Sequence, residues 1–383
     1  MRLVLITSNY QPATVVCGVG DYTRCLRHAL ESLGHHCAVI TSARTRTTEA
    51  EVYRLPGTWG PRDTLTARRI VASLAPDAVF LQYTPEHYGF GVAFKLLPLL
   101  LRLFQRPPRI VTTFHTLVGG RWISRPYAAL LAAISHGIIS TNAELTDLFR
   151  RRLPRWTGKL REIPIGANIP VPQLNRDDAR RRLHDYLGID SGVPIIGTFG
   201  FPAPGKGLDT LLQAVRQLHD PPSVHLLYIG ETRAEDESYQ AWLADLAGQL
   251  GVADRVHWVG ALPSQDVSDL LSGSDAYVVP YDDGANLRRG TLMAGFQAGL
   301  PIITTTPRYA DPALRPGETI LSVPPQSPEA LAERIRSLLA DAAIQDHLRN
   351  EALALRHRFE WRAIAQQHVE LIEHLITEPA CPA

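Results

Sequence analysis

Short apolar runs rich in Val, Ile and Leu alternate along this chain with longer segments whose apolar positions recur at helical spacing. Such an alternation is typical of parallel βαβ units. In the first half it predicts strands at 3–7, 37–41, 78–82, 109–114 and 137–140, with a helix at 21–33. In the second half it predicts strands at 194–200, 225–229, 256–259, 276–279 and 301–305. Helices are expected between these later strands at 208–218, 239–250, 265–272 and 289–297.

The two series of strands are separated near residues 165–172, where Pro164, Pro170 and Pro172 disfavour a continuing helix. A chain of 383 residues is long enough for two domains. We therefore expect an α/β fold with two doubly wound, Rossmann-like domains, at 1–168 and 169–359. Sheets of this kind bind ligands beyond the carboxyl ends of their strands, so a ligand crevice is expected between the strand ends of the two domains.

Composition narrows the functional class. Hydrophobic residues make up 45% of the chain, charged residues 20%, and the net charge is +1, which gives no excess for binding nucleic acid. Four cysteines without CxxC spacing indicate reduced thiols and a cytoplasmic protein. We expect no signal peptide, because Met1 and Arg2 lead directly into a buried strand. The longest apolar stretch, 90–104, is interrupted by Lys95 and Pro98 and is too short to span a bilayer.

Lys206 is one of only three lysines in a chain with 36 arginines. It lies between two glycines, directly after a predicted strand and before a predicted helix. Glycines allow a ligand to approach the backbone, and a helix start adds amide donors and a positive dipole, so a phosphate is the natural partner. The alternative is a solvated lysine in a glycine turn.

Two further candidates follow strands of the first half. Gly18 and Gly20 open the first helix in a Gly-x-Gly arrangement that suits an anion, although a simple turn capped by Asp21 would have the same pattern. His115 lies at the carboxyl end of the strand predicted at 109–114, on the side that faces ligands in open α/β sheets. An ordinary loop histidine is the alternative.

The densest polar cluster follows the strand predicted at 276–279. It combines carboxylates, an amide and two guanidiniums at a predicted helix start, in the order Asp282, Asp283, Asn286, Arg288, Arg289. Carboxylates and amides suit sugar hydroxyls, and arginine suits a diphosphate, which it can bind in a bidentate manner. The alternative is a loop held by Asp–Arg ion pairs.

Seven motifs occur in a characteristic order, at 18–20, 34–41, 113–115, 163–168, 199–209, 259–263 and 299–301. They read Gly-Val-Gly, Gly-His-His-Cys-Ala-Val-Ile-Thr, Thr-Phe-His, Ile-Pro-Ile-Gly-Ala-Asn, Phe-Gly through Lys206-Gly-Leu-Asp, Val-Gly-Ala-Leu-Pro and Gly-Leu-Pro. This order resembles the retaining GT-B glycosyltransferases of family 4, from residue 2 to about 376. The closing Phe359-Glu-Trp-Arg-Ala-Ile-Ala resembles the segment that precedes a helix returning to the first domain, at about 360–378.

The resemblance implies a nucleotide-sugar donor, held by the second domain, and an acceptor on the first. Lys206 would bind the donor diphosphate, Gly18 and Gly20 would face it, His115 would stabilise the reacting centre, and Leu262 would bracket the nucleobase. The remaining implied donor residues are Gly200, Asp283, Asn286 and Thr291. The implied acceptor-side residues are Tyr10, Gln82, Tyr83 and Asn142. Such enzymes stabilise the leaving diphosphate with cationic side chains, so neither a metal nor a cofactor is expected.

Two departures from the family pattern concern the donor site. Phe201 stands where the family usually has Arg, and counting back from Gly299 places Asn286 and Ala294 at its two glutamates. Counting forward from Pro280 instead places Gly284 at the first glutamate, two positions out of step, so an insertion is expected. Asp282 or Asp283 would then replace the lost carboxylate. Arg288 or Arg289, in an Arg-Arg-Gly motif, would supply the missing cation and take part in catalysis.

We therefore expect a transferase that moves a sugar from a nucleotide sugar to a sugar, lipid-linked or small-molecule acceptor with retention. A GT-B nucleotide-sugar epimerase and a catalytically inactive nucleotide-sugar-binding protein are the alternatives. The stretch 90–97, with Arg102 and Arg106, suits either a peripheral contact with the inner face of the membrane or a crossover helix packed on the sheet. The sequence indicates neither the acceptor nor the oligomeric state.

Overall fold

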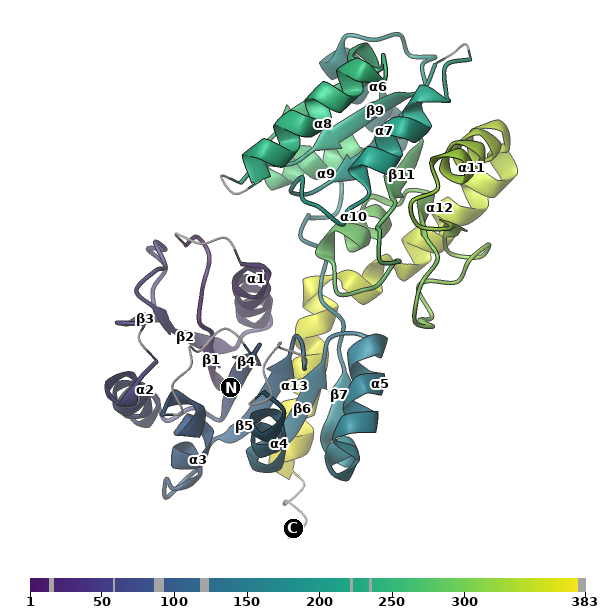
Figure 1. The fold of residues 1–383 in the computed structure, drawn as a ribbon. Helices are drawn as coiled ribbons and strands as arrows, with labels where there is room; N and C mark the ends of the chain where they lie inside the picture. Colours follow the sequence, from purple (N-terminus) through teal and green to yellow (C-terminus); the bar gives the residue numbers. More distant parts are fainter. Residues whose placement is uncertain are drawn as a thin grey trace. The chain divides into compact units, whose positions relative to one another are not determined.

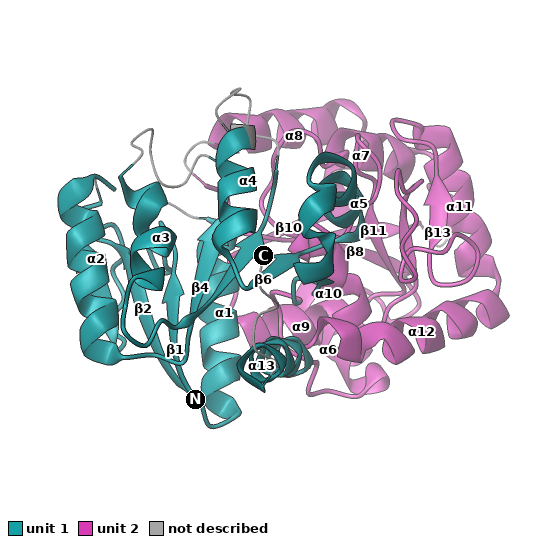
Figure 2. Cartoon of the chain, turned by 90° about the horizontal axis from the view of Figure 1, so that it is seen from below, with its two compact units in different colours: residues 1–166, 361–383 teal, residues 167–360 magenta. Residues whose placement is uncertain are grey.

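The computed structural model describes residues 1–13, 17–57, 59–85, 93–117, 124–220, 223–233 and 236–377. The chain divides into two compact units (Figure 2). Unit 1 consists of Met1–Gly166 and Trp361–Ala383, and unit 2 of Ala167–Glu360. The chain therefore passes between the units twice, after Gly166 and after Glu360.

Unit 1 contains a seven-stranded parallel sheet in the order β3-β2-β1-β4-β5-β6-β7 (Figure 1). Its strands are β1 (Arg2–Ile6), β2 (His36–Ser42), β3 (Val52–Leu55), β4 (Ala78–Tyr83), β5 (Arg109–Phe114), β6 (Gly137–Ser140) and β7 (Leu160–Glu162). The predictions for β5 and β6 are confirmed to the residue, and those for β1, β2 and β4 to within one residue at each end. The edge strands β3 and β7 were missed, because they have only four and three residues, and two of the three in β7 are charged.

Two apolar layers cover the sheet of unit 1, since alternate strand residues point to opposite faces. One layer joins the sheet to α1 (Gly18–Ser32) and α13 (Trp361–Thr377). The other joins it to α2 (Pro61–Leu74), α3 (Leu97–Arg102), α4 (Ser124–Ile134) and α5 (Ala143–Arg152). Helix α13 is the last helix of the chain, yet it packs along α1 in unit 1.

Unit 2 contains a six-stranded parallel sheet in the order β10-β9-β8-β11-β12-β13. Its strands are β8 (Ile195–Phe199), β9 (His225–Ile229), β10 (Val256–Gly260), β11 (Ala276–Val279), β12 (Ile302–Thr305) and β13 (Leu321–Val323). Its helices are α6 (Arg176–Leu187), α7 (Leu208–Arg216), α8 (Glu237–Gln249), α9 (Ser264–Ser272), α10 (Gly290–Ala298), α11 (Pro328–Ala340) and α12 (Ala342–Arg356). Strands β9 and β11 have the predicted bounds, whereas β13 is a further short edge strand that was missed.

The start of helix α1 differs from its prediction, and the difference affects two candidate site residues. Helix α1 begins at Gly18, three residues earlier than predicted, so Gly18 and Gly20 both lie in its first turn. Among the helices that the structure describes, none combines the length and the apolar character needed to cross a bilayer.

Candidate functional site

Each sheet has one point where the order of its strands reverses. In unit 1 the chain runs outward from β1 through β2 to β3 and then returns to β4, on the other side of β1. In unit 2 it runs from β8 through β9 to β10 and returns to β11, beside β8. In doubly wound sheets, ligands bind beyond the carboxyl ends of the strands at this point. The loops after β1, β4, β8 and β11 are therefore the places to look for a site.

In unit 2, the loops that follow β8 and β11 are held against each other. Gly207 has a left-handed backbone with φ of +68°, and a Cβ atom there would lie 1.9 Å from the carbonyl oxygen of Pro280. A Cβ atom on Gly200 would lie 2.4 Å from Cγ2 of Thr291. The backbone N–H of Asp282 donates to the carbonyl of Gly205 at 3.2 Å. The lysine loop and the Asp–Arg cluster are about 80 residues apart in the sequence. They are thus neighbours beyond the carboxyl ends of β8 and β11, a region called here the β8/β11 edge.

Lys206 is half-buried in this edge, and its ammonium donates to the carbonyl of Phe201. Burial lowers the pKa of Lys206 to about 8, and the positive charges of Arg233 and Arg289 lower it further, while Asp236 opposes them. A lysine that is both desolvated and surrounded by other cations gains strongly from an anionic ligand. The arrangement suits a phosphate.

Arg233, which follows β9, is a cation that the sequence analysis missed. Its guanidinium carbon lies 5.1 Å from the centre of the Phe201 ring, and Nζ of Lys206 lies 5.9 Å from the same centre. An ion pair of 2.5 Å with the buried Asp236 holds the guanidinium. The only sequence signal was an arginine three residues after Gly230, the glycine at the end of a strand. Its importance depends on β9 pairing with β8, which the sequence pattern did not show.

The two arginines of the Arg-Arg-Gly motif differ in their surroundings. Both form ion pairs with Asp283, Arg288 at 2.8 Å and Arg289 at 2.7 Å. The side chain of Arg289 is 23% exposed and lies over the Tyr281 ring, 4.3 Å from its centre, whereas that of Arg288 is 48% exposed. Arg289 is also the residue that precedes α10 and the one whose charge reaches Lys206. Of the two arginines, Arg289 is therefore the less exposed and the one whose charge acts on Lys206.

The carboxylates of the cluster also differ. Asp283 is held by the two arginines, whereas Oδ1 of Asp282 is buried without a hydrogen-bond partner among the described residues. Burial raises the pKa of Asp282, and the carboxylates of Asp209 and Asp283 add to this effect. A buried acceptor without a donor is unfavourable unless a ligand supplies one. Asp282 is thus the carboxylate that is placed to accept a hydroxyl.

The other residues predicted for the donor site differ in their burial and hydrogen bonds. Asn286 accepts from the backbone N–H of Arg288 at 3.2 Å, and the Thr291 hydroxyl pairs with that of Tyr281 at 2.7 Å. Ala294 is fully buried inside α10, so it presents no surface to a ligand. Leu262 is half-buried, in the loop between β10 and α9. Within the described residues no group of three His, Cys, Asp or Glu side chains is arranged to hold a metal ion.

In unit 1, His115 lies beyond β5, and its ring contacts Gln82 and Tyr22. Its Nε2 donates to Oε1 of Gln82 at 2.9 Å, and its ring meets that of Tyr22 edge-on, with 4.8 Å between ring centres. Tyr22 belongs to the first turns of α1, two residues after Gly20. A Cβ atom on Gly20 would lie 3.0 Å from the carbonyl oxygen of Asn9, whereas one on Gly18 would meet none of the described atoms within 4 Å. The histidine and the Gly-x-Gly turn are thus linked through Tyr22.

Residues of helix α13 contact Tyr22 and hold it in place. The Tyr22 hydroxyl donates to Nε2 of His368 at 3.0 Å, and Nδ1 of His368 donates to the carbonyl of Ile364 at 2.8 Å. The Trp361 ring meets Tyr22 with 5.3 Å between centres. Complete burial lowers the pKa of His368 to about 4, so the ring is neutral and can accept from Tyr22.

The remaining acceptor-side predictions are mainly buried. The Tyr10 ring is fully buried and its hydroxyl donates to Glu49 at 2.6 Å. Tyr83 is 1% exposed and packs against Phe114. Oδ1 of Asn142 accepts from the backbone N–H of Leu145 at 2.9 Å and so caps α5. These contacts give the three residues structural roles. Gln82, the fourth prediction, contacts His115.

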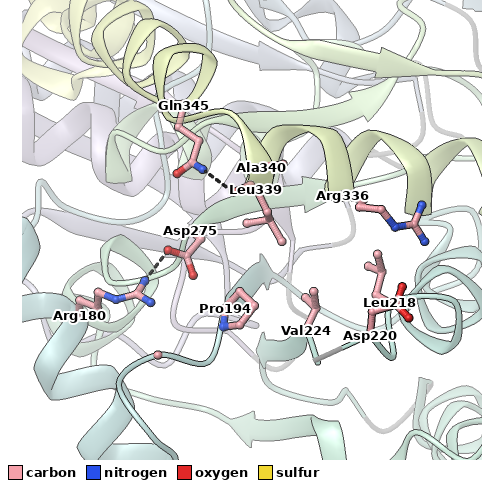
Figure 3. A pocket seen from close by; sticks show the side chains of 11 residues that line it. Arg180, Pro194, Leu218, Asp220, Val224, Asp275, Arg336, Leu339, Ala340 and Gln345 are labelled. Atoms are coloured by element: carbon pink, nitrogen blue, oxygen red, sulfur yellow. Dashed lines mark hydrogen bonds and ion pairs between the residues drawn. The ribbon is translucent and has the colours of Figure 1, made fainter. Parts of the chain in front are cut away.

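A cavity of about 470 Å³ lies at the opposite edge of the unit 2 sheet (Figure 3). Pro194, Val224 and Asp275, which precede β8, β9 and β11, line it. Asp275 forms an ion pair with Arg180 and also accepts from the backbone N–H of Ile195 at 2.8 Å. The carboxylate of Asp275 is thus already paired within the protein. The cavity lies at the amino ends of the strands, so it is separate from the β8/β11 edge at their carboxyl ends.

Comparison with known proteins gives two family matches. Residues 16–169 match the model described as Glycosyltransferase Family 4, and residues 193–341 match that described as Glycosyl transferases group 1. A D-inositol 3-phosphate glycosyltransferase of Corynebacterium urealyticum is 24% identical over 99% of this chain and 97% of its own length. A protein of the same name from Corynebacterium efficiens is 25% identical over 62% of this chain. That second alignment spans 56% of the relative, so the chain matches only about half of it.

Solved structures show the same architecture. Sucrose-phosphate synthase of Thermosynechococcus elongatus superposes with a TM-score of 0.72 at 22% identity, over 98% of this chain and 99% of that chain. HepE of Anabaena, solved with UDP and glucose, superposes with a TM-score of 0.76 at 17% identity, over 98% of this chain and all of that chain. At these identities the likeness establishes the fold, which is that of the GT-B glycosyltransferases.

Proposed function

We propose that this chain, whose two halves match glycosyltransferase family models and whose fold is that of the GT-B glycosyltransferases, transfers a sugar from a nucleoside-diphosphate sugar to an acceptor with retention of the anomeric configuration. One observation carries the proposal: Lys206, Arg233 and Arg289 gather at the carboxyl ends of β8 and β11, where helix α10 also begins. Unit 2 would then be the donor domain and unit 1 the acceptor domain.

The three cations would act on the leaving group. In the reaction, the bond between the anomeric carbon and the diphosphate oxygen breaks, a bond to the acceptor oxygen forms on the same face, and the acceptor proton passes to the departing diphosphate. Negative charge develops on the diphosphate, and preorganised cations stabilise it more than they stabilise the bound donor. The start of α10, where no side chain among the described residues caps the first turn, would add backbone N–H donors.

Asp282 would bind a hydroxyl of the donor, since its Oδ1 has no partner among the described residues. Asp283 is less suited, because Arg288 and Arg289 already occupy it. His115, held by Gln82 and Tyr22, would position the transferred sugar. No carboxylate nucleophile is needed in this mechanism, and no metal ion, because side-chain charges stabilise the leaving diphosphate.

Uridine diphosphate sugars are the first donors to test, since HepE, which shares the fold, was solved with UDP-glucose. Inositol phosphates are the first acceptors, because the relatives from Corynebacterium are named for inositol 3-phosphate. A panel of nucleotide sugars screened by thermal shift would select the donor, because a ligand that binds the folded state raises its melting temperature.

Turnover of the selected donor tests the proposed function. We expect slow hydrolysis without an acceptor, transfer with one, and no loss of rate after a chelator. Proton NMR of the first-formed product reads the anomeric coupling, and an inverted product would contradict retention. An isomerised donor would point to an epimerase, and binding without turnover to an inactive homologue.

A further inference from the structure

Helices α2 and α3 of unit 1 pack side by side and form one outer face, the α2–α3 face, which no part of the proposed reaction uses (Figures 1 and 2). Their inner residues, such as Val71, Leu97 and Leu101, belong to the apolar layer beneath. The outer residues combine two features that seldom occur together on a water-exposed helix pair.

The first feature is exposed leucine. Leu65 on α2 is 51% exposed, and Leu96, Leu99 and Leu103 are 36%, 44% and 71% exposed. The last three are spaced three and four residues apart, so they share one side of the turn and helix that carry them. Single exposed leucines are ordinary, but a cluster of four on adjoining elements marks an interaction surface.

The second feature is unbalanced positive charge. The segments 61–74 and 93–109 contain seven cationic residues and one acid, in a chain whose net charge is +1. The acid, Asp63, is 1% exposed and accepts from the backbone N–H of Trp59, so it does not neutralise the surface. Arg62, Arg69 and Arg106 are exposed, and in the described part of the chain they form no ion pair with a carboxylate.

The two features lie on the same side. The guanidinium of Arg68 reaches from α2 across to the Phe104 ring, 5.0 Å from its centre, just beyond α3. Leu65 is one helical turn before Arg68, so it faces the same neighbour. The exposed leucines and the arginines therefore form one surface rather than two.

We infer that the α2–α3 face binds the surface of an anionic phospholipid bilayer, with its leucines entering the interface and its arginines contacting lipid phosphates. Leucines have no favourable partner on a nucleic acid, whose surface is charged. A second copy of the chain would bring like charges together across a two-fold axis. A bilayer stabilises both kinds of side chain, because the leucines bury apolar area in the interface and the arginines are attracted to anionic head groups. The inference is independent of the proposed function.

Sedimentation with vesicles tests the inference on the full chain. Vesicles of equal parts phosphatidylglycerol and phosphatidylcholine should carry the protein down, and pure phosphatidylcholine should do so far less. Each lost arginine should weaken partitioning roughly fivefold, equivalent to about 1 kcal/mol, so Arg62→Gln/Arg69→Gln/Arg106→Gln should abolish it. Leu99→Ser/Leu103→Ser should weaken it as well. Raised salt should reverse the binding only in part, because the leucine contribution is not screened.

A matched control uses an exposed arginine and leucine of unit 2. Arg334→Gln/Leu353→Ser removes similar side chains from α11 and α12 and should sediment like the unaltered chain. Circular dichroism and nucleotide binding should be the same in all variants. Equal binding to neutral vesicles, equal loss in the control, or retention by RNA without retention by vesicles would each overturn the inference.

Discussion

Lys206, Arg233 and Arg289 bring three positive charges together at the β8/β11 edge, although these charges repel one another. The charges of Arg233 and Arg289 act on Lys206, and Asp236, the carboxylate that opposes them among the described residues, is already paired with Arg233. Such an arrangement weakens a fold without a ligand and is therefore typical of a site for an anion. Single residues of this edge accordingly give the most direct tests of donor binding.

Binding of a nucleoside diphosphate should depend on pH through Lys206. Since burial and neighbouring cations bring the pKa of Lys206 to about 8, the ammonium is lost as pH rises through that value. We expect affinity for UDP to fall above pH 8, approaching tenfold per pH unit, with uptake of a proton on binding. Calorimetry between pH 7 and 9.5, in buffers of different ionisation enthalpy, measures both. Lys206→Arg stays charged and should give a flat profile; the same slope in that variant would assign the effect to another group.

Arg233, Arg288 and Arg289 should not be equivalent in donor binding. Arg289→Ala and Arg233→Ala should each weaken UDP binding by ~1–3 kcal/mol, as expected for loss of a charge-assisted contact. Arg288→Ala should change it little, because that side chain is nearly half exposed. Arg233→Ala should also move the pH midpoint upward, since it removes a charge that lowers the pKa of Lys206. A larger effect of Arg288→Ala than of Arg289→Ala would contradict this assignment.

At the scale of elements, the sequence pattern predicted the strands that lie inside each sheet. Strands β5, β6, β9 and β11 are mainly apolar runs that end at polar residues, glycine or proline, so their limits could be predicted to the residue. Strands β3, β7 and β13 could not be predicted in this way, because each lies at an edge of its sheet and has only three or four residues, which pairing with one neighbour holds extended regardless of their own preference.

Helix α13 should make unit 1 sensitive to acid. The pKa of the buried His368 is about 4, below its ordinary 6.5, so the unfolded state takes up a proton first as pH falls. The stability present above pH 6.5 should decline by about 2 kcal/mol at pH 5 and be lost further toward pH 4. Urea unfolding followed by tryptophan fluorescence measures this decline. His368→Gln keeps an acceptor for Tyr22 without a titrating ring, and an equally steep decline in that variant would exclude His368 as the cause.

At the scale of the whole molecule, the order of strands explains which site residues the sequence could indicate. Composition alone indicated Lys206 and the 282–289 cluster, since a rare lysine and a dense polar loop can be recognised in the linear sequence. Arg233 was missed because it belongs to the site only through the pairing of β9 with β8, a long-range contact. The choice between Asp282 and Asp283, and between Arg288 and Arg289, likewise required the ion pairs and burial that folding creates.

The double passage of the chain between the units has a consequence for its synthesis. Residues 361–377 complete the apolar layer of unit 1 through Ile364, Val369 and Ile372, yet they leave the ribosome after all of unit 2. Unit 2 is one continuous segment, so it can finish folding while unit 1, begun first, still exposes the face that α13 will cover. Domains usually complete folding from the N-terminus onward during translation. In this protein we expect the reverse order, so that a stalled or truncated product would present an unfinished N-terminal half to chaperones and proteases.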